Sequence, residues 1–442
     1  MRLAVFTAKY PARVATFFER DMRALLDAGI EIDIFSIYPL DAGQWRFALD
    51  ILGEDVLPRD RVHHAGVGRS LAGARRLPAS RVGTLAGDSA AILASATRYG
   101  ATTLAKTAYV LPKAWDWAGQ FADRFDHVLA YWGNYAGTCA YAFHRLINRP
   151  IPFSIWLHAG TDLYHTPVFL REKMLYADSI ITCCEFNRGF VEQSYPDIAG
   201  AIADRIHVCY HGLDLAKFAF SPGNRPGRRV LAVGRLARHK GFDYLIRAAH
   251  LLGEQGFDID VDLVGDGPER RALATLADSL GIGHSVHFRG WLPFDGVRAA
   301  MSEATILVHP SDGLGDGLPN VLREAMAVGT PVIASDVAGI PEALDGGRCG
   351  TLVPPRDVNA LADAMRAMLT DDTMRIRFAY LGRKRTEERF DMWRNGSRLA
   401  SHLQSLTRME PAAARTPLRL LPPSPGVPIE VGVADAVGAQ KR

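Results

Sequence analysis

Two carboxylates lie eight residues apart in a glycine-rich segment, and their spacing suits a ligand that carries several hydroxyl groups. Asp316 lies in a loop after the apolar run at 306–308, and Glu324 follows about one turn into a predicted helix at 320–328. Because a helical side chain leans back toward the N-terminus of its helix, both acids could face one pocket. Carboxylates only accept hydrogen bonds, so a fixed pair of them fits the vicinal hydroxyls of a ribose or a hexose.

The same two residues also have a simpler explanation. Taken singly, Asp316 could be a helix-capping residue and Glu324 a solvated helix side chain. The start of the predicted helix nevertheless offers free backbone N–H groups and the positive end of the helix dipole, which favour an anionic or polyhydroxylated ligand.

A strand, a loop, a helix and a second strand must position these acids. The run at 306–308 is typical of a buried strand, Gly329-Thr330-Pro331 ends the helix, and the run at 332–334 predicts the next strand. This order indicates a parallel α/β sheet, in which ligands bind at the carboxyl ends of the strands.

A second turn of this kind carries two cations. A strand at 230–233 leads into the turn at 234–241, which contains Arg235 and Lys240, and a helix is predicted at 242–252. Two cations at such a turn could stabilise negative charge on a ligand, although an exposed turn with two basic residues is unremarkable by itself.

These segments carry a resemblance to a known family. GLPNVLREAMAVGTPVIAS at 317–335 and GRLARHKGFDYLIRAA at 234–249 resemble the family 4 retaining glycosyltransferases, which have the GT-B fold. The two acids resemble the family's E-x₇-E motif, with Asp316 in place of the first Glu. Aspartate is one methylene shorter, so the sugar must sit closer or a water must bridge the gap.

The resemblance implies a role for each matched residue in the second half of the chain. Glu324 would hold the ribose of a nucleotide-sugar, and Arg235 and Lys240 would neutralise its diphosphate. Asp316 and the backbone of Gly317 and Leu318 would hold the sugar being transferred.

The first half of the chain contributes further candidates. FSIWLHAGTDLY at 153–164 resembles the family's histidine segment, which implies that His158 orients the transferred sugar and that Asp162 and Tyr164 line the acceptor side. Aromatic and amide side chains also follow a strand predicted at 126–131, where such groups commonly recognise sugar rings, and packing against the next helix is an equal alternative. These acceptor-side candidates are Trp132, Asn134 and Tyr135.

Composition excludes several other classes of protein. The 442 residues carry a formal net charge of +3, which gives no bulk attraction to nucleic acid. The five cysteines form no CxxC pair, which argues for free thiols in a reducing cytoplasm and against a zinc site. The run DIDVDLV at 258–264 predicts a strand with one wet face and not a metal-binding acidic pair. We therefore expect neither a cofactor nor a metal.

Membrane contact, if it exists, is expected to be peripheral. The N-terminus lacks the apolar core of a signal peptide, and no run of eighteen apolar residues occurs. The stretch from Arg59 to Lys106 is rich in basic residues, which is typical of solvated helix faces but could also bind anionic lipid head groups. We expect a cytoplasmic protein.

The resemblance implies two facing Rossmann-like domains with a cleft between them, the GT-B arrangement. The acceptor-side domain is expected at 1–220 and the nucleotide-sugar domain at 221–388, after a Gly- and Pro-containing linker. A helix at 389–408 is expected to cross back to the first domain, and the Pro-rich tail at 409–442 to be disordered.

The function implied by the resemblance is transfer of a sugar, with retention, from a nucleotide-sugar to a hydroxyl acceptor. The expected acceptor is a lipid-linked or oligosaccharide intermediate of surface polysaccharide synthesis. Two alternatives remain open from the sequence: a GT-B sugar phosphorylase or nucleotide-sugar epimerase, and a non-enzymatic two-lobed sugar-binding protein.

Overall fold

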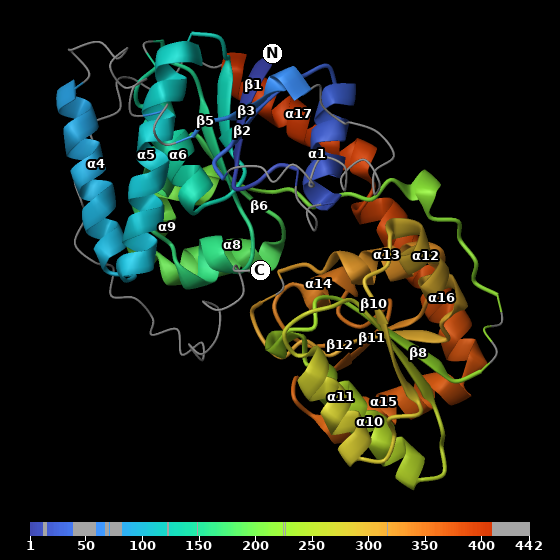
Figure 1. The fold of residues 1–442 in the computed structure, drawn as a ribbon. Helices are drawn as coiled ribbons and strands as arrows, with labels where there is room; N and C mark the ends of the chain where they lie inside the picture. The colour runs from blue at the N-terminus through green and yellow to red at the C-terminus, as the bar shows by residue number, and fades with distance from the viewer. Residues whose placement is uncertain are drawn as a thin grey trace. The chain divides into compact units, whose positions relative to one another are not determined.

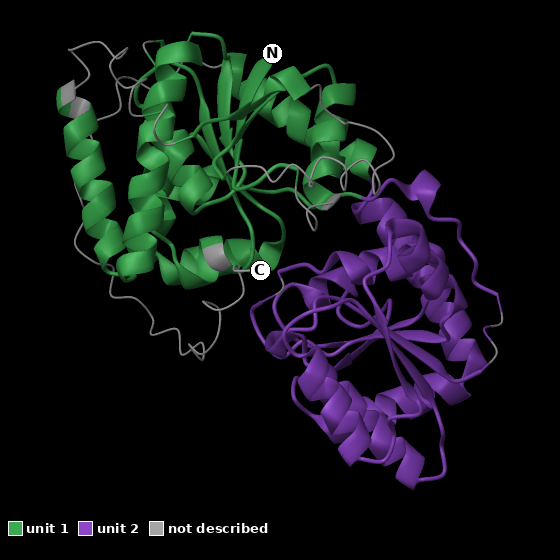
Figure 2. Ribbon diagram, viewed as in Figure 1, with its two compact units in different colours: residues 1–212, 392–426 green, residues 213–391, 427–442 purple. Residues whose placement is uncertain are grey.

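The computed structural model divides the chain into two compact units. It describes residues 1–11, 16–38, 59–66, 70, 82–121, 123–147, 149–223, 225, 227–315 and 317–408. Within these, unit 1 comprises residues 1–212 and 392–408, and unit 2 comprises residues 213–391 (Figure 2). The basic residues at 69, 75, 76 and 81 and the tail at 409–442 lie outside the described residues.

Unit 1 is a parallel sheet covered on both faces by helices (Figure 1). The described strands run in the order β3-β2-β1-β4-β5-β6-β7, so the direction of winding reverses between β1 and β4. The strands are β1 (Arg2–Thr7), β2 (Glu31–Ser36), β3 (Val62–His64), β4 (His127–Ala130), β5 (Phe153–Leu157), β6 (Ser179–Thr182) and β7 (Ile206–Val208). The helices are α1 (Thr16–Asp27), α4 (Val82–Thr97), α5 (Ala101–Phe121), α6 (Tyr135–His144), α7 (Leu170–Tyr176), α8 (Glu185–Ser194), α9 (Pro196–Ile202) and α17 (Met392–Arg408), with short turns η1 (Arg59–Arg61), η4 (Thr161–His165) and η5 (Ala203–Arg205).

Unit 2 repeats this architecture. Its described strands run in the order β10-β9-β8-β11-β12-β13, which places the reversal between β8 and β11. The strands are β8 (Arg229–Val233), β9 (Asp260–Val264), β10 (Val286–Gly290), β11 (Ile306–His309), β12 (Val332–Ser335) and β13 (Thr351–Val353). The helices are α10 (Phe242–Glu254), α11 (Arg270–Ser279), α12 (Phe294–Glu303), α13 (Asn320–Val328), α14 (Ile340–Ala343), α15 (Val358–Thr370) and α16 (Asp372–Arg389), with short turns η6 (Leu215–Lys217) and η7 (Arg238–Lys240).

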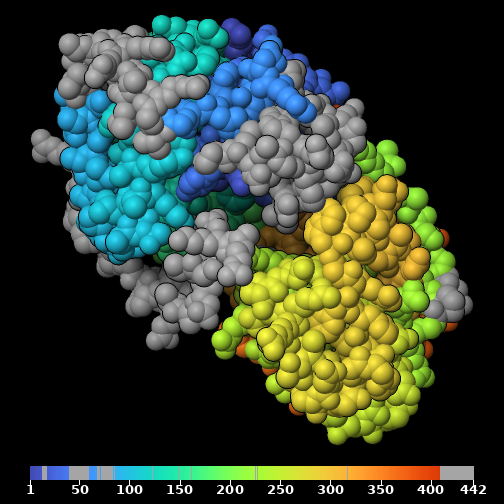
Figure 3. Space-filling view, in the orientation of Figure 1, coloured from blue at the N-terminus to red at the C-terminus, as the bar shows by residue number. Residues whose placement is uncertain are grey.

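The strands form because short apolar runs can be buried on both faces only in a covered parallel sheet. Every residue of β4, β6, β11 and β12 is buried. One apolar core in unit 2 joins β8, α10 and α15 through residues such as Val230, Leu245 and Met365. In the space-filling view, the yellow and orange segments that follow β8 form most of the visible face of unit 2 (Figure 3).

The last described helix, α17, belongs to unit 1 and packs on α1. Leu399 and Leu403 enter the core of unit 1 beside Leu25. A Cβ at Gly396 would lie 2.2 Å from the Cβ of Ala24, so the absence of a side chain lets the two helices approach closely.

The prediction of a wet face on β9 is wrong for Asp262. This residue is 7% exposed, and its Oδ1 accepts a hydrogen bond of 2.6 Å from Arg289 Nε. The neighbouring guanidinium compensates the buried carboxylate, which local alternation cannot reveal. No group of three or more metal-binding side chains occurs among the described residues.

Candidate active site

The carboxyl ends of β8 and β11 mark the reversal point of unit 2, where an open parallel sheet leaves a crevice for a ligand. The turn after β8 carries Arg235, which is exposed, and Lys240, which is half-buried. The aliphatic part of Lys240 lies against Gly234, since a Cβ there would be 3.9 Å from the lysine Cδ and Cε. Gly241 follows in the left-handed conformation at φ +66° and begins α10.

The loop after β11 is fastened to this turn. The Ser311 hydroxyl and the Asp312 backbone N–H both donate to the backbone oxygen of His239, at 2.9 and 3.0 Å. Gly315 lies against the His239 ring, where a Cβ would come within 2.5 Å of Cδ2. A Cβ at Gly241 would lie 2.0 Å from the backbone oxygen of Pro310. The cationic turn and the loop that leads to α13 therefore form one rigid edge.

The loop after β9 completes this edge. Gly234 N donates to Val264 O at 2.9 Å, and Leu236 N donates to Asp266 O at 3.0 Å. Gly265, at φ +134°, has room for no side chain, because a Cβ would lie 1.9 Å from Gly234 O. A Cβ at Gly267 would likewise lie 2.4 Å from Leu236 O, so close backbone contact explains both glycines.

Of the residues predicted around the two acids, all but one lie within the described part of the chain. Asp316 lies outside the described residues. Gly317 and Leu318 are buried, and Gly317 O accepts from Gly339 N at 2.8 Å. Glu324 is half-buried on α13, just over one turn from the start of the helix. The Pro319 N-cap makes no side-chain cap, so the helix start keeps backbone N–H groups for a ligand.

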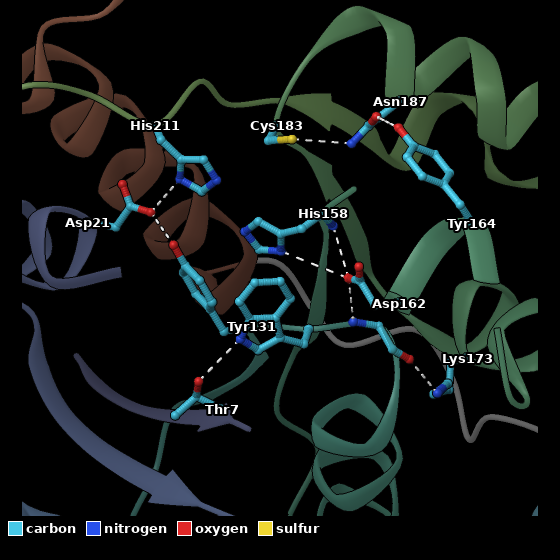
Figure 4. Close-up of polar contacts among 12 residues, drawn as sticks. Thr7, Asp21, Tyr131, His158, Asp162, Tyr164, Lys173, Cys183, Asn187 and His211 are labelled. Atoms are coloured by element: carbon cyan, nitrogen blue, oxygen red, sulfur yellow. Dashed lines mark hydrogen bonds and ion pairs between the residues drawn. The ribbon is translucent and has the colours of Figure 1, made fainter. Parts of the chain in front are cut away.

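In unit 1, His158 lies directly after β5 in a cluster of rings (Figure 4). Its ring centroid is 4.4 Å from that of Trp132 and 5.0 Å from that of His211, and the two imidazoles are within 8° of parallel. His158 is 5% exposed, and neither of its ring nitrogens makes a hydrogen bond within the described residues. Trp132, by contrast, is half-buried and donates from Nε1 to Thr7 Oγ1 at 3.3 Å.

Asp162 holds the backbone around this cluster. One of its oxygens accepts from His158 N at 3.0 Å and from Gly133 N at 3.1 Å. On the opposite side, Lys173 Nζ donates to Gly133 O at 2.6 Å, so the loop after β4 is held from both sides (Figure 4). Burial raises the pKa of Asp162 to about 7 and lowers the pKa of Lys173 to about 7.

The other acceptor-side candidates are placed differently from one another. Tyr164 is 1% exposed and donates to Asn187 Oδ1, so its hydroxyl is used inside unit 1. Tyr135 is 9% exposed and begins α6, with Lys106 Nζ 5.8 Å from its ring centroid. Asn134 is half-buried at the start of the same helix, and its Oδ1 makes no hydrogen bond within the described chain. Roles in binding an acceptor stay predictions for all three.

Sequence reasoning missed a buried charged pair beside His158. Asp21 on α1 accepts a hydrogen bond from His211 Nδ1 at 2.6 Å and another from the hydroxyl of Tyr131. Burial opposes the charged form of His211, but the Asp21 carboxylate outweighs it and raises the pKa of His211 to about 9. Burial and the neighbouring His211 lower the pKa of His158 well below its ordinary value. Asp21 and His211 are 190 residues apart, so no local pattern could reveal the pair.

The predicted residues therefore fall into two groups. The first group belongs to unit 2 and lies on loops or helix starts at the carboxyl edge of its sheet: Arg235, Lys240, Gly317, Leu318 and Glu324. His158 and the acceptor-side candidates belong to unit 1 and lie at the corresponding edge of that sheet.

No described helix is both long enough and apolar enough to span a bilayer.

Comparison with known proteins places this geometry in context. Residues 227–371 match the family model described as glycosyl transferases group 1. WcaL of Escherichia coli (strain K12), named as a colanic acid biosynthesis glycosyltransferase, is 33% identical over 214 residues, which cover 47% of this chain and 53% of WcaL. The chain thus matches about half the length of that relative. The amylovoran biosynthesis glycosyltransferase AmsK of Erwinia amylovora is 26% identical over 92% of this chain and 100% of AmsK.

Solved structures confirm the predicted fold. HepE from Anabaena, solved in complex with UDP, superimposes with a TM-score of 0.66 at 19% identity and covers 91% of this chain and 99% of HepE. Sucrose-phosphate synthase from Thermosynechococcus elongatus gives 0.68 at 18% identity, over 92% of this chain and 99% of the synthase. The chain has the GT-B fold, with two Rossmann-like domains.

Proposed function

We propose that this chain, whose second unit carries the match to the group 1 glycosyl transferases, moves a sugar from a nucleotide-sugar to a hydroxyl acceptor. The observation that carries the proposal is the edge at the reversal point of unit 2. There, the turn with Arg235 and Lys240 is fastened through His239 to the loop that leads into α13. Such an edge offers cations and helix N–H groups to one anionic ligand.

The donor site follows from the charge that the reaction develops. Breaking the bond between sugar and diphosphate leaves negative charge on the departing nucleotide, and Arg235 and Lys240 stabilise it. Glu324 accepts hydrogen bonds from the ribose hydroxyls. Asp316, together with the backbone of Gly317 and Leu318, holds the sugar, and the start of α13 adds N–H donors.

The transfer proceeds with retention of configuration. We assign no residue as a covalent nucleophile, so the acceptor hydroxyl attacks from the face that the diphosphate leaves. The departing phosphate takes the proton of the acceptor, and His158 orients the sugar through a ring nitrogen. Trp132, Asn134, Tyr135, Asp162 and Tyr164 form or support the acceptor side. The cations of the turn replace a metal ion in this scheme, so the reaction needs none.

The acceptor is a lipid-linked or oligosaccharide intermediate of a surface polysaccharide, and the enzyme works at the cytoplasmic face of a membrane. The relatives named for colanic acid and amylovoran biosynthesis support this acceptor class. A third relative, named as a phosphatidyl-myo-inositol mannosyltransferase of Mycobacterium leprae, is 36% identical over 159 residues, which cover 36% of this chain and 41% of that protein. The name of that relative includes phosphatidyl-myo-inositol, which is a lipid.

A thermal-shift panel tests the donor class. UDP, GDP and ADP, and one sugar conjugate of each, are added to the full chain at concentrations up to the millimolar range. A ligand at one hundred times its dissociation constant stabilises the folded state by about 3 kcal/mol, so one base should raise the melting temperature by several degrees. Lys240→Ala is the test variant, and Lys384→Ala is its matched control, because the side chain of Lys384, on α16, is 70% exposed. Stabilisation by free sugars and by no nucleotide would instead favour a sugar-binding protein.

A further inference from the structure

His158 is buried without the hydrogen bonds that a buried imidazole normally has. Its side chain is 5% exposed, and both ring nitrogens lack a hydrogen-bond partner among the described residues. The nearest carboxylate oxygen, Asp162 Oδ2, is 4.0 Å from Nδ1 and already accepts two backbone N–H groups. Leaving a buried polar atom without a partner is unfavourable, so a ring in this state is poised to bond a ligand.

Aromatic rings pack against His158 from several sides. His211 stacks on it with the centroids 5.0 Å apart and the planes 8° apart. Trp156 also stacks on it at 5.6 Å, and Tyr131 and Trp132 are tilted against it at 4.8 and 4.4 Å. The orientation of the ring therefore depends on the neighbours that hold His211 in place.

His211 is held by Asp21. The two side chains are 5% and 7% exposed, and Nδ1 donates to Oδ2 at 2.6 Å. The hydroxyl of Tyr131 donates to the same oxygen, so the carboxylate links two of the rings that lie beside His158 (Figure 4). A buried carboxylate with an imidazole this close favours the charged form of both groups.

Backbone packing fixes His211 as well. It follows β7, and the next residue, Gly212, lies against the first residue of α17, where a Cβ would come within 2.1 Å of the Met392 Cα. Three elements distant in sequence thus meet at this point. They are α1 with Asp21, the segment after β7 with His211, and the start of α17.

We propose that Asp21 and His211 are positioning residues for His158: the His211 ring, anchored by the Asp21 carboxylate, stacks on the His158 ring and fixes its plane. This inference rests on the proposed function, in which His158 bonds a hydroxyl of the transferred sugar. An uncharged ring has one donor and one acceptor nitrogen, and one of them must face the hydroxyl in a single tautomer.

The surrounding charges are consistent with this arrangement. Burial raises the pKa of Tyr131 and of Cys209, so both stay uncharged near neutral pH. Cys183, directly after β6, and Arg398, on α17, act on the same cluster. Asp162 is the other group that faces His158 and titrates near neutrality, since burial raises its pKa to about 7. Any pH effect of the pair must therefore be separated from that of Asp162.

Histidine NMR of the full chain tests the pairing without any substrate. Among the 14 histidines, the signals of His158 and His211 are assigned from the spectra of His158→Gln and His211→Gln. In the wild type, His211 should stay doubly protonated up to about pH 8, while His158 stays neutral and in one dominant tautomer. In Asp21→Asn, the midpoint of His211 should fall below about 7 and His158 should show both tautomers.

The matched control is Asp33→Asn. Asp33 accepts from His63 at 2.7 Å in a half-buried pair on β2 and β3, so this variant removes an equivalent contact elsewhere in unit 1. This variant should leave the titration of His211 and the dominant tautomer of His158 unchanged. A wild-type His211 that titrates near its ordinary value of about 6.5, or an unchanged His158 tautomer in Asp21→Asn, would overturn the proposal.

Kinetics supply the second readout. With whichever of UDP-glucose, GDP-mannose and ADP-glucose the wild type turns over, Asp21→Asn should lower kcat about tenfold and change KM for the donor by less than about twofold. Asp33→Asn should keep wild-type kcat. If Asp21→Asn keeps wild-type kcat between pH 6 and 9, the positioning role is refuted. If the wild type turns over no donor, the proposed function fails, and the His158 tautomers still decide whether the pair positions this ring.

Discussion

Replacing Gly241 by alanine tests whether the cationic turn and the loop after β11 act as one edge. Gly241 sits at φ +66°, between Lys240 and the start of α10, and its α-carbon faces the backbone oxygen of Pro310. An added Cβ would lie 2.0 Å from that oxygen and 3.0 Å from Cδ2 of Tyr244. Because the first obstacle is backbone, the turn and the loop must separate to make room.

The cost has two parts. A left-handed conformation costs an alanine about 1 kcal/mol more than it costs glycine. Relief of the clash through a backbone shift adds about 1–3 kcal/mol, by analogy with overpacked cores. The variant should therefore destabilise unit 2 by about 2–4 kcal/mol, and the displaced Lys240 should weaken nucleotide binding by about tenfold or more.

Hydrogen exchange read by mass spectrometry measures the local effect, and calorimetric titration of nucleoside diphosphates measures the binding. In Gly241→Ala, amides of α10 and of the loop after β11 should exchange faster together. The matched control is Gly253→Ala on the same helix, where a Cβ meets nothing within 4 Å, and it should stabilise α10 by about 0.5 kcal/mol. If Gly241→Ala exchanged and bound like the wild type, the two loops would not form one edge.

Two further predictions concern single side chains. Lys240→Ala should lower turnover by about a hundredfold with the melting temperature unchanged, because the departing diphosphate loses a stabilising positive charge. The control Lys384→Ala should keep wild-type turnover. Equal rates in the two variants would refute the electrostatic argument. The pKa of His211 is raised to about 9, so its pairing with Asp21 stabilises the fold fully below about pH 6.5 and loses this effect as the pH rises through about 9. The destabilisation caused by Asp21→Asn in urea should therefore shrink by about 3 kcal/mol between pH 6 and pH 10, and a constant difference would contradict the assignment of that pKa.

Local sequence signals predicted unit 2 well. The helix predicted at 320–328 matches α13 residue for residue, because an N-cap region and the Gly329-Thr330-Pro331 stop define its ends chemically. The strands at the reversal point were likewise readable as short apolar runs. These features depend on neighbours in the chain, so a single sequence contains them.

What the sequence could not reveal depends on contacts between distant segments. The alternation in β9 predicted a solvent-exposed face, but Arg289, on the neighbouring strand β10, donates to Asp262 and offsets the cost of burying its carboxylate. The clamp of Lys173 on Gly133 joins residues 40 positions apart, and the pair of Asp21 and His211 joins residues 190 apart. Such pairs become visible only when the fold brings their segments together.

The most direct test of the central claim is calorimetric titration of UDP, GDP and ADP into the wild type and into the double variant Arg235→Ala/Lys240→Ala. We predict that one diphosphate binds the wild type and that the double variant binds it at least about tenfold more weakly, with its melting temperature unchanged. Equal affinity in the two proteins, or no binding of any of the three diphosphates by the wild type, would contradict the assignment of this edge of unit 2 as a nucleotide site.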